Sequence, residues 1–173
     1  MPVREHLKGA PEVIRTAVVT VSTSKFEKAA AGENPKDTSG DLATEMLEEA
    51  GHEVSYRVLV PDNMDVIAGT VGWLVERVDA VITTGGTGIT PTDVTIEALS
   101  KVADKEVEGF GEIFRMRSIE EIGEHAVLSR AAMFVIKETP VFCLPGSPNA
   151  VKTGMEIILE ILGHAVVHAA GRA

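Results

Sequence analysis

The first half of the chain alternates between short apolar runs and longer amphipathic segments. Residues 16–21 (TAVVTV), 53–60 and 80–84 (AVITT) are short runs in which β-branched residues are frequent, which predicts buried strands. Residues 41–50 and 65–77 lie between these runs and carry apolar side chains at helical spacing. Strands that alternate with helices in this way indicate βαβ units, which build a parallel sheet covered by helices.

Further helices are expected in the second half of the chain. The pattern predicts helical segments over residues 93–103 and 109–116 and a last helix over residues 149–168. Another helix is expected to begin at Ser118, because Ser-Ile-Glu-Glu has the spacing of a capping box. The second half of the chain is therefore expected to be largely helical, apart from the strand segments described next.

The segments between these helices complete the expected order of elements. Residues 133–136 and 140–144 predict two strands joined by a tight turn. Residues 24–36 are polar and contain glycine and proline, so we expect a mobile loop there. The sequence Asp-Thr-Ser-Gly at residues 37–40 offers several N-caps for the helix that follows.

The length of 173 residues and the 45% content of hydrophobic residues allow one sizeable core. No repeat, low-complexity stretch or linker divides the chain. We therefore expect a single α/β domain over residues 1–173, a three-layer α/β/α sandwich with a mostly parallel sheet. Residues 1–14 are expected to be a flexible N-terminal extension.

The composition excludes several classes of protein. A formal net charge of −10 argues against non-specific binding of nucleic acid, which needs basic surface to neutralise phosphates. Cys143 is the one cysteine, so no internal disulfide can form. The apolar runs are far shorter than the roughly 18–20 residues that cross a bilayer. These features favour a soluble cytoplasmic protein that has no membrane partner.

Ligands of open parallel sheets bind beyond the carboxyl ends of the strands, so the segments that leave the strands are candidate sites. The sequence Gly85-Gly86-Thr87-Gly88 follows the expected strand 80–84 directly. Glycines without side chains let successive backbone N–H groups converge on phosphate oxygens. The loop is no P-loop, and Pro91 stands where a dinucleotide-binding motif would need its third glycine. An ordinary tight turn is the alternative reading of these glycines.

Two acidic residues also follow predicted strands. Asp93 lies at the start of the next helix, and Asp62 follows the strand 53–60. Each has an ordinary explanation, as a helix N-terminal acid or as a turn residue. Mg²⁺ is held by one or two carboxylates together with substrate oxygens and water. Two acids that flank a glycine loop therefore favour a metal-assisted nucleotide site over the separate ordinary explanations.

Several motifs in this order resemble the MoaB/MogA family of molybdenum cofactor biosynthesis. They are TTGGTG at residues 83–88, TDVT at 92–95, EVEGFGEIFRMR at 106–117, LSR at 128–130 and LPGSPNAV at 144–151. The resemblance extends over roughly residues 16–168. It implies a three-layer α/β fold of the MogA type that binds molybdopterin as a homotrimer or a dimer of trimers.

The resemblance also implies an activity, molybdopterin adenylyltransferase. In this reaction the terminal phosphate of molybdopterin attacks the α-phosphorus of Mg-ATP, which gives adenylylated molybdopterin and pyrophosphate. The two catalytic acids of the family correspond to Asp62 and Asp93, which would hold Mg²⁺ through the phosphates of ATP. ATP and molybdopterin are substrates, and a downstream metal-insertion enzyme is an expected partner.

The resemblance assigns further residues to the two substrates. The nucleotide-binding residues are expected to be Ser22, Gly85, Gly86, Thr87 and Gly88. The pterin-binding residues are expected to be Ser118, Ser129, Pro145, Gly146, Ser147 and Pro148. Lys25, Arg115, Arg117 and Arg130 are the basic residues nearest to these motifs, and we interpret each as a solvated charge or an ion-pair partner.

The chain departs from its relatives at one position and keeps an acid at another. Many catalytic relatives have aspartate directly after the serine that leaves the first strand, where this chain has Thr23. A metal-binding role of that loop is therefore in doubt. The bacterial MoaB branch of the family lacks the acid at the position of Asp62, and that branch is not expected to adenylylate molybdopterin. The presence of Asp62 in this chain therefore favours an active enzyme.

Other functions remain open at this point. The chain could be a non-catalytic molybdopterin carrier, a pyrophosphatase similar to the CinA family, or a structural trimeric module. Paired aspartates are typical of the CinA loop, whereas Val94 follows Asp93 here. His164 and His168 lie four residues apart, but without a further ligand nearby we do not expect a metal site. The choice between molybdenum and tungsten is open because metal insertion follows the expected step.

Overall fold

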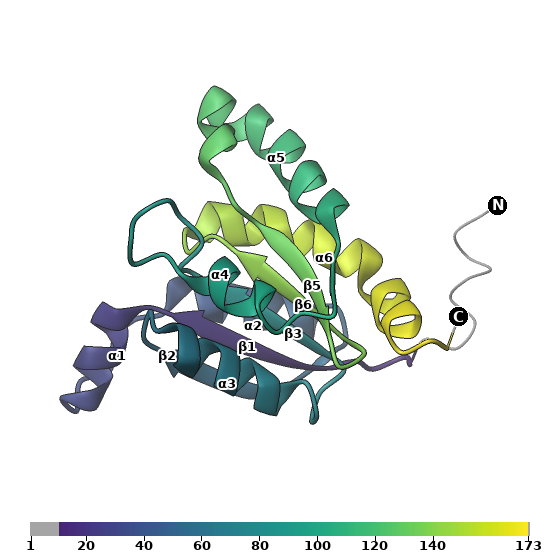
Figure 1. Ribbon diagram of the computed structural model, residues 1–173, viewed down its shortest axis with the longest axis horizontal. Helices are drawn as coiled ribbons and strands as arrows, with labels where there is room; N and C mark the ends of the chain where they lie inside the picture. Colours follow the sequence, from purple (N-terminus) through teal and green to yellow (C-terminus); the bar gives the residue numbers. More distant parts are fainter. Residues whose placement is uncertain (1–10, 173) are drawn as a thin grey trace.

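The computed structural model describes residues 11–172 and contains a six-stranded sheet in the order β2-β1-β3-β6-β5-β4. Helices cover both faces of this sheet (Figure 1), which confirms the expected three-layer α/β/α architecture. The strands are β1 (Arg15–Val21), β2 (Glu53–Val60), β3 (Ala80–Thr84), β4 (Lys105–Glu106), β5 (Ala132–Ile136) and β6 (Thr139–Leu144). The α-helices are α1 (Thr23–Ala30), α2 (Thr38–Glu49), α3 (Met64–Leu74), α4 (Thr95–Ser100), α5 (Glu108–Ile122) and α6 (Pro148–Ala169), and a 3₁₀ helix covers Gly123–Leu128.

The sheet is parallel on one side and antiparallel on the other. Strands β2, β1, β3 and β6 are parallel neighbours, so their carboxyl ends lie at the same edge. Strands β5 and β6 form an antiparallel hairpin, and β4 pairs antiparallel with β5. The hairpin turn places Lys137 and Glu138 at φ values of 48° and 65°, which suits the twist of the two strands.

Alternate side chains of the strands enter two separate cores. On β6, Phe142 and Leu144 pack with α2, α5 and α6, whereas Val141 and Cys143 pack with α3 and α4. All four side chains are fully buried. Burial raises the pKa of the Cys143 thiol to about 12, so this cysteine is an inert core residue.

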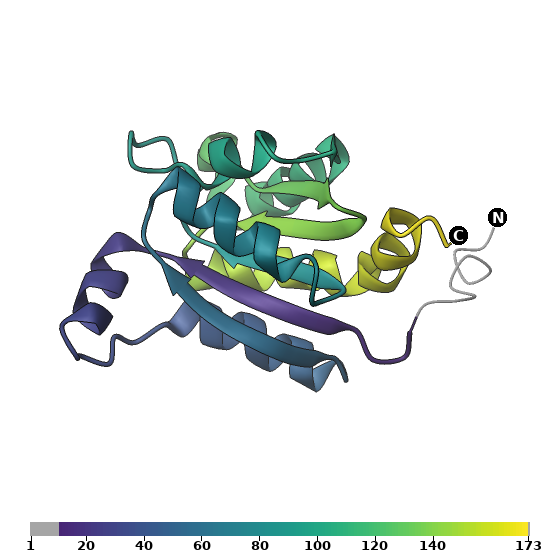
Figure 2. The same ribbon diagram turned by 60° about the horizontal axis from the view of Figure 1, so that its bottom comes forward.

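Helix α1 occupies most of the segment that was expected to be a loop. It begins after Ser22, whose side chain accepts a hydrogen bond from the backbone N–H of Lys25. The helix is short and mostly polar, and Gly32 and Pro35 follow it, so the composition of the segment favoured a loop. Helix α1 projects beyond the carboxyl edge of the sheet, at the left of Figure 2.

The expected helix start at Ser118 is wrong. Ser118 lies within the continuous helix α5, and its hydroxyl donates to the carbonyl of Phe114 at 2.8 Å instead of capping a new helix. Helix α4 is shorter than the expected segment 93–103, because residues 90–94 form a turn around Asp93. The two-residue strand β4 was not predicted, since it is too short to show a pattern.

The two ends of the chain bear on the remaining expectations. The expected flexible extension falls mainly on residues 1–10, which lie outside the described residues, whereas Ile14 is buried in the core. Within residues 11–172, no helix combines the length and the apolar character that a membrane span requires.

The two-sided core makes a prediction about stability. Phe142 is completely buried at the centre of the sheet and makes an edge contact with Phe110 at 5.4 Å between ring centroids. Phe142→Ala should lower the free energy of unfolding by about 3–5 kcal/mol, measured by urea titration. Phe26→Ala on α1, where Phe26 is 39% exposed, is the matched control and should cost less than half as much. Equal losses in both variants would contradict this account of the core.

Candidate functional site

Four segments that leave parallel strands meet at the carboxyl edge of the sheet. The backbone N–H of Ser22, after β1, donates to the carbonyl of Val60 at the end of β2. The N–H of Gly85, after β3, donates to the carbonyl of Leu144 at the end of β6. The N···O distance is 2.9 Å in both hydrogen bonds. The predicted loops are therefore joined directly by their backbones.

The glycine loop is packed too closely for side chains. Gly85 and Gly86 have φ values of 95° and 67°, which favour glycine. A β-carbon at Gly85 would lie 2.3 Å from the carbonyl oxygen of Val21, and one at Gly86 would lie 2.3 Å from Thr95 Oγ1. Thr95 also binds the loop, because its hydroxyl donates to the carbonyl of Gly85 and its N–H to that of Gly86. The loop is thus a rigid backbone surface.

A cavity of about 340 Å³ lies beside this loop. It is lined by Gly85, Gly86, Thr87, Gly88, Asp93, Leu128, Ser129, Arg130, Pro145 and Gly146. The structure therefore brings together the predicted glycine loop, one predicted acid and three of the six residues assigned to the pterin. Such a volume is within the range of small-molecule sites.

The other three residues assigned to the pterin lie elsewhere. Ser118 is buried inside α5, bound to Phe114. Ser147 is the N-cap of α6, where its hydroxyl accepts from the N–H of Ala150, and Pro148 is the first residue of that helix. Ser147 and Pro148 adjoin the cavity in sequence but do not line it. Their assignment, like that of Ser118, stays a prediction.

Asp62 is held by the first turn of α1. The backbone N–H and the hydroxyl of Thr23 both donate to Asp62 Oδ2 at 2.8 Å, and the N–H of Asp62 donates back to Thr23 Oγ1 at 2.9 Å. The other oxygen, Oδ1, would lie 3.2 Å from a β-carbon at Gly86. Asp62 therefore has one oxygen fixed by Thr23 and one beside the glycine loop.

Asp93 lies against the other end of the loop. A β-carbon at Gly88 would lie 2.6 Å from Asp93 Oδ2, and the N–H and hydroxyl of Thr90 donate to this oxygen at 2.9 and 2.6 Å. Partial burial tends to raise the pKa of Asp93. Hydrogen bonds from Thr90 and Gly88 and the charge of Arg130 outweigh that effect, so the pKa lies below its ordinary value. Asp93 is an ionised carboxylate at neutral pH.

Arg130 supports the glycine loop from outside, a role that the sequence did not reveal. Its Nε donates to the carbonyls of Thr87 and Gly88 at 3.0 and 2.9 Å. Its terminal nitrogens form an ion pair with both carboxylate oxygens of Glu97 on α4, at 2.5 and 3.2 Å. The interpretation of Arg130 as an ion-pair partner is confirmed, but its bonds to the loop make it part of the site.

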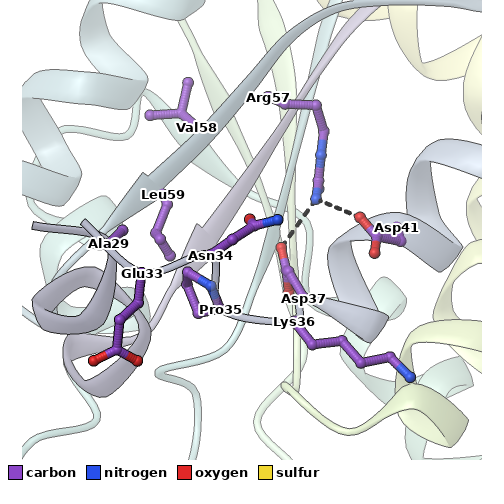
Figure 3. A pocket seen from close by; sticks show the side chains of 10 residues that line it. All are labelled: Ala29, Glu33, Asn34, Pro35, Lys36, Asp37, Asp41, Arg57, Val58 and Leu59. Carbon is purple, nitrogen blue, oxygen red and sulfur yellow. Dashed lines mark hydrogen bonds and ion pairs between the residues drawn. The ribbon is translucent and has the colours of Figure 1, made fainter. Parts of the chain in front are cut away.

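A larger groove of about 600 Å³ lies along β2 and contains none of the predicted site residues (Figure 3). Arg57 extends from β2 and forms ion pairs with Asp37 and Asp41 at 3.0 and 3.1 Å. Asp37 also caps α2, and its carboxylate binds the ammonium group of Lys25 on α1. These ion pairs attach α1 and α2 to β2, and so they shape this edge of the sheet.

The acids of the site suit a Mg²⁺ ion that is also bound by phosphate oxygens, and they do not suit a metal ion that is bound by protein side chains alone. No group of three or more His, Cys, Asp or Glu residues that could hold a metal occurs in the described part of the chain. Asp62 and Asp93 lie against the same glycine loop, and Asp62 Oδ1 lies beside its backbone. Two separate carboxylates match the few protein ligands that Mg²⁺ takes when phosphate oxygens complete its shell.

Comparison with known proteins agrees with this geometry. The model of a family described as "Probable molybdopterin binding domain" matches residues 17–164. The chain is 47% identical to "Molybdenum cofactor biosynthesis protein B" of Bacillus cereus over 168 residues, which is 95% of each chain. It is 43% identical over 173 residues to "Molybdopterin adenylyltransferase" of Pyrococcus furiosus, covering 98% of this chain and 99% of that protein.

A solved structure supports the same relationship. The crystal structure described as the tungsten cofactor synthesizing protein MoaB from Pyrococcus furiosus aligns with a TM-score of 0.80 and 43% sequence identity. The alignment covers 93% of this chain and 99% of the crystallised one. The family match spans most of the chain, and the relatives match over nearly their full length. The chain therefore belongs to the molybdopterin-binding family that includes the MoaB proteins.

Proposed function

We propose that this protein is a molybdopterin adenylyltransferase that uses Mg-ATP and releases pyrophosphate. The observation that carries the proposal is the position of Asp62 and Asp93 against opposite ends of one glycine loop beside a cavity. The relative named molybdopterin adenylyltransferase, 43% identical over 99% of its length, supports the same activity. The product would enter the synthesis of a molybdenum or tungsten cofactor in the cytoplasm.

The reaction requires positioning and charge neutralisation. The terminal phosphate oxygen of molybdopterin forms a bond to the α-phosphorus of ATP, and the bond from that phosphorus to the oxygen bridging the α- and β-phosphates breaks, releasing pyrophosphate. The backbone N–H groups of Gly86 and Thr87 orient the phosphates, because the N–H of Gly85 is bonded to Leu144 and that of Gly88 to Asp93. Ser129, Pro145 and Gly146 also line the cavity. Mg²⁺ held by Asp62 and Asp93 would neutralise the charge that develops on the leaving group.

The first test replaces one acid. Asp62→Asn should lower pterin-dependent release of pyrophosphate from Mg-ATP on the order of 100-fold or more, because the neutral amide is a much weaker ligand for Mg²⁺. Asp93→Asn should have a similar effect. Asp65→Asn, an exposed acid in the first turn of α3, is the matched control and should keep wild-type turnover.

The result also separates the alternatives. No pyrophosphate release by the wild type, despite measurable binding of molybdopterin, would contradict the proposal and indicate a carrier. Release that does not require the pterin would instead indicate a pyrophosphatase.

A second test concerns the support of the loop by Arg130. Arg130→Met removes hydrogen bonds to two loop carbonyls and the ion pair with Glu97, so kcat/KM should fall about 10- to 100-fold. Arg130→Lys should recover little, because a single ammonium group cannot replace the planar guanidinium fork. Arg117→Met, which removes the exposed ion pair to Glu160, should change kcat/KM by less than about twofold. Equal effects at positions 117 and 130 would exclude a specific role of Arg130.

We also propose that copies of this chain assemble through α5, as a trimer or a dimer of trimers. Helix α5 lies at the top of Figure 1, and Ile113, Met116, Ile119 and Ile122 occur on it at intervals of three residues. Each of these side chains is at least 46% exposed, and the apolar stripe continues to Val127 and Leu128. An apolar stripe of this extent on one helix is typical of a subunit interface.

Assembly is tested by replacing one residue of the stripe. Ile119→Glu should shift the mass measured by sedimentation equilibrium from that of an oligomer to that of the monomer, because it places a charge in the apolar contact. Val66→Glu on α3 introduces the same charge at a position that is 41% exposed, and should leave the mass unchanged. A monomeric wild type would contradict the proposed assembly.

A further inference from the structure

Thr23, the first residue of α1, makes a contact with Asp62 that an aspartate at the same position could not make. Its hydroxyl donates to Asp62 Oδ2 at 2.8 Å and accepts from the backbone N–H of Asp62 at 2.9 Å. A carboxylate at this position would be an acceptor only and would lie beside a second carboxylate of the same charge. The contact therefore depends on a residue that both donates and accepts.

The contact leaves the two oxygens of Asp62 in different environments. Oδ2 accepts two hydrogen bonds from Thr23, one from the backbone N–H and one from the hydroxyl. Oδ1 lies beside the backbone of Gly86. The side chain of Asp62 is thus fixed in one orientation, with a single oxygen directed to the glycine loop.

We infer that Thr23 is a positioning residue that makes Asp62 a one-oxygen ligand for a divalent cation at the glycine loop. The inference rests on the proposed function, since it concerns the Mg²⁺ that would accompany ATP. Mg²⁺ demands near-ideal octahedral geometry, so a carboxylate that is held in one orientation binds it better than one that rotates. In this chain a neutral hydroxyl performs the orienting task, and the loop after β1 supplies no metal ligand of its own at position 23.

The position of α1 explains why a hydrogen bond is suited to this task. No residue of α1 is buried, so apolar packing does not hold the first turn of this helix against Asp62. Polar contacts hold it instead, namely the contact of Thr23 with Asp62 and the ion pair of Lys25 with Asp37 at 3.0 Å. Loss of the Thr23 hydroxyl therefore leaves the carboxylate with one hydrogen bond from Thr23 instead of two, and removes the return bond from the N–H of Asp62.

The test measures cation binding directly. Mn²⁺ is titrated into the protein in the presence of saturating α,β-methylene-ATP, which cannot be cleaved at the α-phosphorus, and bound Mn²⁺ is followed by electron paramagnetic resonance. Thr23→Val should weaken Mn²⁺ binding about tenfold, since a hydrogen bond to a charged group is lost. Thr23→Ser, which keeps the hydroxyl, should bind Mn²⁺ within about twofold of the wild type. Thr44→Val, which removes a helix hydroxyl that bonds to Gly40, is the matched control and should leave Mn²⁺ binding unchanged.

A double variant separates positioning from general structural damage. If Thr23 acts through Asp62, Thr23→Val should weaken Mn²⁺ binding no further when Asp62→Asn is already present. Equal weakening in both backgrounds, wild-type binding by Thr23→Val, or failure of Thr23→Ser to restore binding would each overturn the inference. Thr23→Ala provides the same comparison if the valine variant does not unfold cooperatively.

The outcome is distinguishable from the outcome for the proposed function. A wild type that binds Mn²⁺ with the ATP analogue but releases no pyrophosphate in the presence of molybdopterin would refute the adenylyltransferase and leave the positioning result standing. A wild type that binds no Mn²⁺ beyond that held by the free nucleotide would overturn the inference about Thr23.

Discussion

The backbone of Gly85 lies so close to the ends of β1 and β6 that every other feature of the site depends on this approach. Its N–H bonds to Leu144, and the carbonyl oxygen of Val21 occupies the space that a β-carbon would need. A β-carbon at Gly146 would in turn lie 3.3 Å from the Cα of Gly85. The exits of three strands therefore form one layer of backbone, in which a side chain at position 85 would force the strands apart.

The glycine loop is held by this layer of backbone and also by two side chains that bind its carbonyl groups. Thr95 binds the loop from within the fold, through the carbonyls of Gly85 and Gly86. Arg130 binds the carbonyls of Thr87 and Gly88 from the segment between the 3₁₀ helix and β5. The carbonyls of four successive residues are thus all occupied by the protein itself.

The parts of this arrangement that the sequence could predict are those with a local signal. The strands were predicted because they are short apolar runs, three of which are followed directly by glycine or proline, and the common edge of the carboxyl ends follows from the parallel order. Helix α1 escaped prediction because its segment is short and mostly polar and is followed by glycine and proline. The roles of Thr23 and Arg130 have no local signal at all, since Thr23 binds a residue 39 positions away and Arg130 binds residues 33 to 43 positions away. Such contacts are created by the order of strands in the sheet.

The distribution of charge around the loop explains why a cation is needed for the proposed reaction. The guanidinium of Arg130 is occupied by Glu97 and by loop carbonyls, and the ammonium group of Lys25 is occupied by Asp37. Asp62 and Asp93 are stabilised by hydroxyl and N–H groups of Thr23 and Thr90, which carry no positive charge. The chain has a net charge of −10. At this loop the triphosphate of ATP would meet the carboxylates of Asp62 and Asp93, and the charges of Arg130 and Lys25 are already paired with other acids. In the proposed reaction, a divalent ion held by the carboxylates would offset that repulsion, and nucleotide binding would then depend on the cation.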